Sequence, residues 1–109
     1  MKRDDFPIRA THVAGVQHHN PERCKVLVSG ERLTLRREPT NPHDGNAVEI
    51  LSNGVKLGYI PRTEAIFLAK MMDHGFPFYA KVVDSDTTYD FTQVNISVWV
   101  PAWPMAEDV

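Results

Sequence analysis

The sequence has little of several features that define whole classes of protein. Cys24 is its single cysteine, which excludes an internal disulfide and a zinc site built from cysteines alone. It has no uninterrupted apolar run of about 18 residues, so we predict no membrane-spanning helix. No apolar stretch follows the charged N-terminal residues, as a secretory signal would require. We therefore expect a cytoplasmic protein.

A surplus of positive charge is also missing. The chain has 12 lysines and arginines against 14 aspartates and glutamates, which gives a net charge of −2. Proteins that coat nucleic acid gain much of their affinity by neutralising phosphates with basic side chains. The charge balance therefore excludes a general coating protein and leaves room only for a small, local nucleic-acid site.

The composition is that of an ordinary globular domain. With 42% hydrophobic and 24% charged residues, the chain is too apolar to be a disordered one. A length of 109 residues suits a single hydrophobic core. We predict one domain over residues 1–100 and a loosely held tail over residues 101–109, which contains two prolines and acidic residues.

Short β-type stretches separated by turn residues run through the first half of the chain. Residues 8–16 are rich in β-branched side chains, and residues 25–29 form a short apolar segment before a glycine. Residues 32–37 alternate polar and apolar side chains, which is typical of a half-buried strand. Residues 47–51 and 55–60 flank a Ser-Asn-Gly sequence, which predicts a β-hairpin with a type I′ turn.

The second half predicts one helix and two more strands. Thr63 is a candidate cap, and an apolar stripe with helical spacing then runs to about His74, where Gly75 ends it. Residues 78–83 and 91–100 predict strands joined by a polar connection at 84–90. Many short strands with one helix favour a small antiparallel barrel with the helix packed at one end.

The most specific sequence lies between Leu33 and Arg62. It contains the string E-P-x-N-P-x-D-x-N-A-V, which begins at Glu38, and ends in G-Y-I-P-R. These motifs resemble the signature of the HIRAN family, and the V-A-G-V sequence at 13–16 and the M-D-x-G sequence at 72–75 extend the resemblance to about residues 8–100.

The resemblance implies a mainly β fold, an OB-like barrel of about six strands, and a binding module without catalytic activity or cofactor. Family members occur fused to SNF2-type repair translocases and as separate bacterial proteins, and the fused form captures the 3′-hydroxyl end of single-stranded DNA. Implied partners here are such an end and a separately encoded helicase or nuclease, in DNA repair or replication-fork processing. The implied nucleic-acid-binding residues are Gln17, His18, His19, Asn41, His43, Asp44, Tyr59, Arg62 and Phe91. Positions 18, 19 and 43 are typically aromatic in the DNA-binding members and are histidines in this sequence.

The chemistry of these residue types agrees with end recognition. An ionised Asp44 can accept a hydrogen bond from a 3′-hydroxyl and would repel a phosphate in the same place. Arg62 can hold the adjacent phosphate, and planar side chains can stack on the terminal bases.

Other interpretations of the same residues remain open. The Asn41–Asp44 loop can be turn chemistry alone, because Asn and Asp side chains bond their own backbone. The three histidines and Asp44 could bind a metal in a hydrolase, although the sequence has no H-E-x-x-H motif. Phe67 and Met71 lie one helical turn apart and could mark a protein-interaction face.

Overall fold

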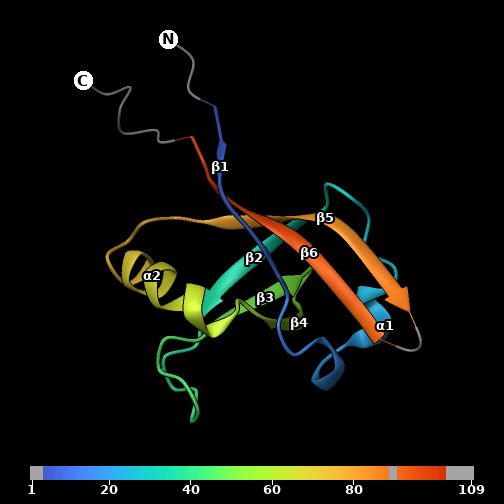
Figure 1. Cartoon of the computed structure of the whole chain (residues 1–109). Helices are drawn as coiled ribbons and strands as arrows, with labels where there is room; N and C mark the ends of the chain where they lie inside the picture. The colour runs from blue at the N-terminus through green and yellow to red at the C-terminus, as the bar shows by residue number, and fades with distance from the viewer. Residues whose placement is uncertain (1–3, 89–90, 103–109) are drawn as a thin grey trace.

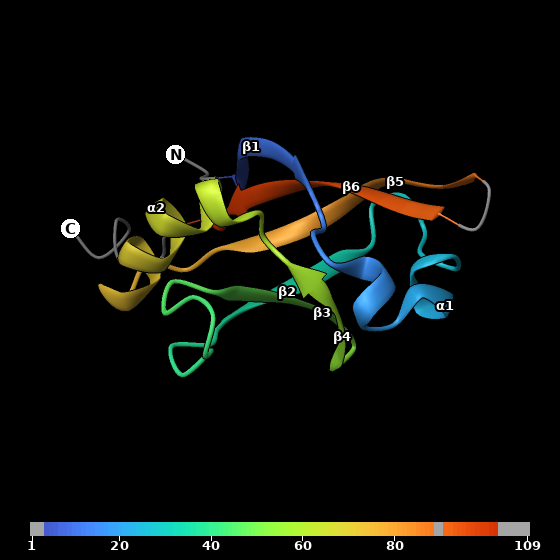
Figure 2. The same ribbon diagram turned by 60° about the horizontal axis from the view of Figure 1, so that its bottom comes forward.

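Six antiparallel strands form one sheet in the computed structural model, which describes residues 4–88 and 91–102. The order across the sheet is β1-β6-β5-β2-β3-β4. The strands are β1 (Phe6–His12), β2 (Arg32–Arg37), β3 (Val48–Ser52), β4 (Val55–Tyr59), β5 (Tyr79–Thr88) and β6 (Phe91–Val100). Figure 2 shows the sheet folded over, with β1, β6 and β5 in one layer and β2, β3 and β4 in the other. This half-barrel confirms the prediction of a mainly β, OB-like fold.

A backbone bridge joins the two edges of the folded sheet. After β1 the chain crosses to β4, where the N–H of Ala14 donates to the carbonyl of Tyr59 at 2.8 Å and the N–H of Tyr59 donates to the carbonyl of Ala14 at 2.9 Å. Gly58 allows this approach, because a Cβ atom at that position would lie 2.3 Å from the Ala14 carbonyl oxygen. The bridge fixes the segment after β1 against the end of β4.

Alternation and turn chemistry explain the strands that the sequence predicts well. On β2, Leu33 and Leu35 point into the core while Arg32, Thr34 and Arg36 face outward. The β3–β4 turn has φ angles of 49° at Asn53 and 83° at Gly54, both in the left-handed region that a type I′ turn requires. Both predictions are confirmed.

Helix α2 (Arg62–Asp73) lies at one end of the sheet, as predicted (Figure 1). Ala65, Leu68 and Ala69 enter the core, which explains its apolar stripe. The predicted start at Thr63 is wrong: the helix begins at Arg62, with Pro61 at the N-cap position and no side-chain cap. Pro61 suits this position because its fixed φ and missing N–H do not disturb a helix start.

Three other segments differ from the sequence prediction. The first strand ends at His12, because the chain then turns through a 3₁₀ helix, η1 (Val16–His18), and a short helix, α1 (Pro21–Cys24). Residues 25–29 form no strand, and their valines are exposed. The predicted polar connection at 84–90 is wrong over 84–88, where β5 continues and pairs with β6 up to Thr88.

The predicted tail at 101–109 falls almost wholly outside the described residues. At its start, the N–H of Ala102 donates to Asp5 Oδ1 at 2.6 Å. Within residues 4–88 and 91–102, no helix is long and apolar enough to cross a membrane.

Candidate functional site

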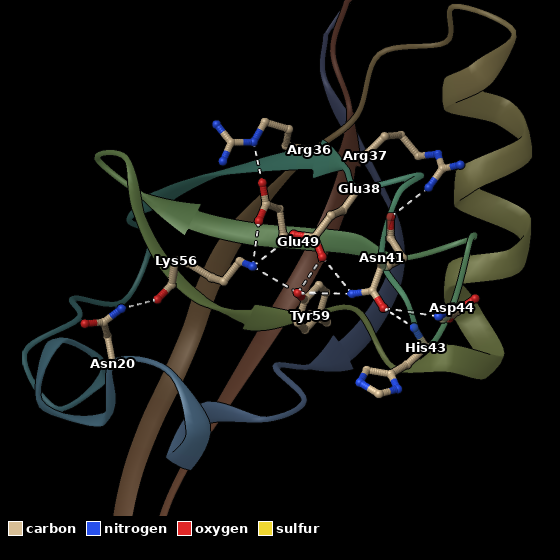
Figure 3. A network of polar contacts seen from close by, with 11 residues as sticks. Asn20, Arg36, Arg37, Glu38, Asn41, His43, Asp44, Glu49, Lys56 and Tyr59 are labelled. Atoms are coloured by element: carbon tan, nitrogen blue, oxygen red, sulfur yellow. Dashed lines mark hydrogen bonds and ion pairs between the residues drawn. The ribbon is translucent and has the colours of Figure 1, made fainter.

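Asn41 organises the loop between β2 and β3. Its Oδ1 accepts the backbone N–H groups of His43 at 2.8 Å and Asp44 at 3.1 Å, which forms the turn that the sequence indicates. Its Nδ2 donates to Glu38 Oε1 at 2.6 Å and to the Tyr59 hydroxyl at 3.3 Å (Figure 3). Asn41 therefore positions its neighbours through four hydrogen bonds.

A charged network behind the loop fixes Tyr59. The Tyr59 hydroxyl donates to Glu38 Oε1 at 2.8 Å and accepts from Lys56 Nζ at 2.9 Å. Lys56 Nζ also lies 2.9 Å from Glu38 Oε2 and 3.1 Å from Oε2 of the buried Glu49. Glu49 is in turn paired with Arg36 on β2. Figure 3 shows these side chains as a continuous chain of contacts across β2, β3 and β4.

The network favours the charged forms of Glu38 and Lys56. Hydrogen bonds from Lys56 and then from Tyr59 lower the pKa of Glu38 to about 2. The hydrogen bond with Tyr59, and then those with the two glutamates, raises the pKa of Lys56. Tyr59 is therefore held by groups that remain ionised throughout the physiological pH range.

Glu38→Gln should make the stability of the fold less dependent on pH in the acidic range. The pKa of Glu38 lies below its ordinary value of 4.5, so its stabilising effect is present above about pH 5 and lost as pH falls from 4.5 towards about 2. The difference in urea midpoint between parent and variant should therefore be largest near pH 7 and shrink over that window. Glu22→Gln, at an 85% exposed side chain paired with Lys25, is the control and should follow the parent. A parent–variant difference that stays constant from pH 7 to pH 2 would contradict the network.

Five of the implied site residues line one pocket of about 210 Å³: Asn41, His43, Asp44, Tyr59 and Arg62. Ala14, Ala47 and Ile60 complete its wall. They converge there because the loop after β2, the end of β4 and the first turn of α2 meet at this edge of the sheet.

An acidic and a basic side chain lie next to each other in this pocket. Asp44 Oδ2 is 3.5 Å from Arg62 Nε, and Asp44 Oδ1 accepts the backbone N–H of Asn46 at 2.9 Å. Arg62 Nη2 also donates to the carbonyl of His43 at 3.0 Å. The side chain of Asp44 is only 19% exposed and that of Arg62 is 68% exposed, so the carboxylate is recessed and the guanidinium reaches into solvent.

Gln17 and Phe91 line a second pocket of about 360 Å³. Its other walls are the segment from His12 to Val16 and two residues at the start of β6, Thr92 and Gln93. Phe91 is 56% exposed. Ala14, held by the bridge to Tyr59, lines both pockets, so they adjoin across this segment.

Neither His18 nor His19 lines either pocket. His19 packs edge-on against Tyr59, with ring centroids 5.4 Å apart and planes at 68°. Burial, followed by the charge of Lys56, lowers the pKa of His19, which favours its neutral ring. His18 is exposed on η1. The sequence thus placed His19 beside the site, where it supports Tyr59.

The residues that sequence reasoning missed are the partners of Tyr59, namely Glu38 and Lys56. Glu38 opens the E-P-x-N-P string, so the motif contained the signal. Lys56 lies in the hairpin strand without any local feature that marks it, because its role comes from contacts across three strands.

Two alternatives from the sequence can be placed on the structure. Among the residues described, no group of three or more His, Cys, Asp or Glu side chains could hold a metal ion, so the three histidines and Asp44 do not assemble such a site. Phe67 and Met71 line a separate apolar pocket of about 300 Å³ beside β1 and the end of β6.

The family model of the HIRAN domain matches residues 10–103. The chain belongs to the HIRAN domain family. This HIRAN domain is 31% identical over 90 residues to the helicase-like transcription factor of Oryctolagus cuniculus, covering 81% of this chain and 9% of that protein. It is 29% identical to the helicase-like transcription factor of Homo sapiens, covering 81% of this chain and 8% of that protein. The HIRAN domain described here thus spans less than a tenth of these relatives.

Solved structures confirm the HIRAN fold. A protein from Lactobacillus plantarum has a TM-score of 0.82 at 24% identity, covering 94% of this chain and all of that one. The crystal structure of the HIRAN domain of human helicase-like transcription factor has a TM-score of 0.65 at 24% identity, over 90% of this chain and 77% of that one. A HIRAN domain of helicase-like transcription factor was also solved by NMR in its DNA-bound conformation, with a TM-score of 0.57 at 25% identity over 92% of this chain and 80% of that one.

Proposed function

We propose that this HIRAN domain binds single-stranded DNA and captures its 3′-hydroxyl end in the pocket between the Asn41–Asp44 loop and the start of α2. The observation that carries the proposal is the Asp44–Arg62 pair at the mouth of that pocket. A free 3′ end offers a hydroxyl donor next to a negatively charged phosphate, and the pair offers an acceptor next to a cation.

Both side chains have capacity left for a ligand. Asp44 accepts one backbone N–H and lies near one guanidinium nitrogen, although a carboxylate has about four acceptor positions. Arg62 directs Nε towards Asp44 and Nη2 towards the His43 carbonyl, which leaves other N–H groups of its five. A hydroxyl can therefore reach Asp44 while the adjoining phosphate lies against Arg62.

The second pocket extends the same surface for the bases. Phe91 is an exposed ring at one side of it, and Gln17 offers both an amide donor and an amide acceptor. Stacking of a base on an aromatic side chain is worth about 1–3 kcal/mol and tolerates any base. Since Ala14 lines both pockets, a strand whose end lies at Asp44 can place a base in the second pocket.

The likeness to the HIRAN domain of helicase-like transcription factor in its DNA-bound conformation supports DNA as the ligand. In this proposal the domain supplies recognition, without catalysis, and presents captured ends to a separately encoded helicase or nuclease in DNA repair. Asn41, Tyr59 and His19 act as positioning residues, because their polar groups or rings contact each other and the loop.

The salt dependence of oligonucleotide binding tests this function. With one to three phosphate contacts, the slope of log K against log salt should be about −0.7 to −2, since each contact to a single strand adds about −0.7. Arg62→Ala should make the slope shallower by about 0.7, because it removes one contact. Arg9→Ala is the matched control, since Arg9 is 57% exposed and its Nε lies 3.5 Å from Glu64, at a different pocket. Equal effects of the two variants would contradict the assignment of Arg62.

A further inference from the structure

The outer face of β2, β5 and β6 carries two cations directly opposite each other. Arg32 on β2 and Lys81 on β5 are partners in the antiparallel register. Like charges in this position destabilise a sheet. Among the lysines and arginines within 4–88 and 91–102, all except Arg32, Lys70 and Lys81 form an ion pair with a carboxylate. Within the described residues, the two adjacent cations therefore form no ion pair of this kind.

Two stacked aromatic rings hold these cations in place. Tyr79 and Trp99 are register partners on β5 and β6, with ring centroids 6.3 Å apart and planes at 15°. The guanidinium carbon of Arg32 lies 3.7 Å from the centre of the Tyr79 ring, and Lys81 Nζ lies 4.3 Å from the centre of the Trp99 ring. Contacts with ring faces stabilise a cation without using its N–H donors. Both groups therefore keep donors for an anion.

Asp5 is an acidic side chain close to this surface. It accepts the Tyr79 hydroxyl and the N–H of Ala102, and these bonds, together with the charges of Arg32 and Lys81, lower its pKa. Its oxygens are thus engaged with Tyr79 and Ala102, and it forms no ion pair within 4.0 Å of either cation in the described residues. Within residues 4–88 and 91–102, Asp5 is thus shared between two cations, which leaves this part of the surface positive although the chain has a net charge of −2.

The cation surface lies on the same outer face as Tyr59. Tyr59 is opposite Glu49, Glu49 is opposite Arg36, and Arg36 and Arg32 point outward from β2. Crossing two strands covers about 10 Å, and four residues along β2 cover about 13 Å. Arg32 is therefore roughly 16 Å from the Tyr59 position, and Lys81, one strand further, is roughly 20 Å from it. Both distances are within the span of about 4–16 nucleotides that a single OB-type fold covers.

We propose that Arg32 and Lys81 bind phosphates of the same single strand, 5′ to the end held at Asp44 and Arg62. The proposal rests on the proposed function of that pocket and adds a second contact that depends on strand length. The register pair supplies two cations side by side, which suits neighbouring phosphates of one strand.

Two oligonucleotides with the same 3′-hydroxyl end separate the two sites, one of about 2 nucleotides, which is shorter than the smallest OB-type site, and one of about 12 nucleotides. The parent should bind the longer strand more tightly. The double variant Arg32→Gln, Lys81→Gln should bind the short strand like the parent, lose roughly tenfold affinity for the long one at 0.1 M salt, and lose about 1.4 from its salt slope. The exchange Arg32→Lys, Lys81→Arg keeps both charges and should keep the long-strand affinity, which separates loss of charge from misfolding.

The control with the same loss of charge is Arg9→Gln, Lys70→Gln, on β1 and α2, which should leave both affinities unchanged. Equal parent affinity for the two lengths would overturn the cation surface while leaving the pocket intact. A third outcome is that the parent binds only the long strand and the double variant loses this binding. That outcome would support the cation surface and overturn the pocket. No binding of either strand would overturn both.

Discussion

A single strand that ends in a 3′-hydroxyl is expected to bind at least about tenfold more tightly than the same strand ending in a 3′-phosphate. A hydrogen bond to a charged acceptor is worth about 1.5–3 kcal/mol, and about 1.4 kcal/mol corresponds to tenfold in affinity. Asp44 would make that bond with the hydroxyl, and its recessed carboxylate would repel a terminal phosphate. Both effects favour the same end, so this difference should be among the largest that the domain displays.

Asp44→Asn should narrow this difference mainly by improving the binding of the phosphate end. The amide oxygen can still accept the N–H of Asn46, so the loop keeps its shape while the repelling charge is removed. Glu31→Gln is the matched control, because Glu31 is also paired with an arginine, Arg23, and neither residue lines the pocket. Fluorescence anisotropy with both strands measures the four affinities. Equal affinity of the parent for the two ends would contradict end capture.

Gly58→Ala is expected to lower the free energy of unfolding by about 3 kcal/mol, the upper part of the range for overpacked positions. The new Cβ would lie 2.3 Å from the Ala14 carbonyl oxygen and 2.7 Å from a methyl group of Val13, and the φ of Gly58 is 157°. Relief of this overlap requires Ala14 to leave Tyr59, which breaks the bridge that joins the edges of the sheet.

Urea denaturation measures this change, and Gly45→Ala is the control, since its Cβ would meet one backbone oxygen at 3.9 Å. Gly58→Ala should also weaken DNA binding, because Ala14 lines both pockets. An unchanged urea midpoint for Gly58→Ala would mean that the bridge contributes nothing to the fold.

The parts of the fold that the sequence predicted are those with local causes. Asn53 and Gly54 require a particular turn, and the alternation around Leu33 and Leu35 requires a half-buried strand. Residues 84–88 have no such pattern, because their side chains are mostly exposed and the strand exists through pairing with β6. Partner strands override a polar sequence, and only the structure reveals them.

The candidate site likewise contains residues with a local sequence signal and residues without one. The Asn41–Asp44 turn is local and could be predicted. The hydrogen bond by which Asn41 also positions Tyr59 could not be predicted. Residues 17 and 91 lie next to the loop pocket only because the segment after β1 crosses from β6 to β4 at Ala14. A contact between segments so far apart in sequence leaves no local signal, and the family resemblance was the only route to it.

Chemical-shift mapping by NMR tests the central claim most directly. A ¹⁵N-labelled sample is titrated with a short single strand carrying a 3′-hydroxyl, and the backbone amide signals are followed. Our account predicts that the largest changes cluster at Ala14, His43, Asp44, Tyr59 and Arg62, with smaller changes at Gln17 and Phe91. Changes confined to the apolar pocket around Phe67, or spread evenly over the surface, would contradict it.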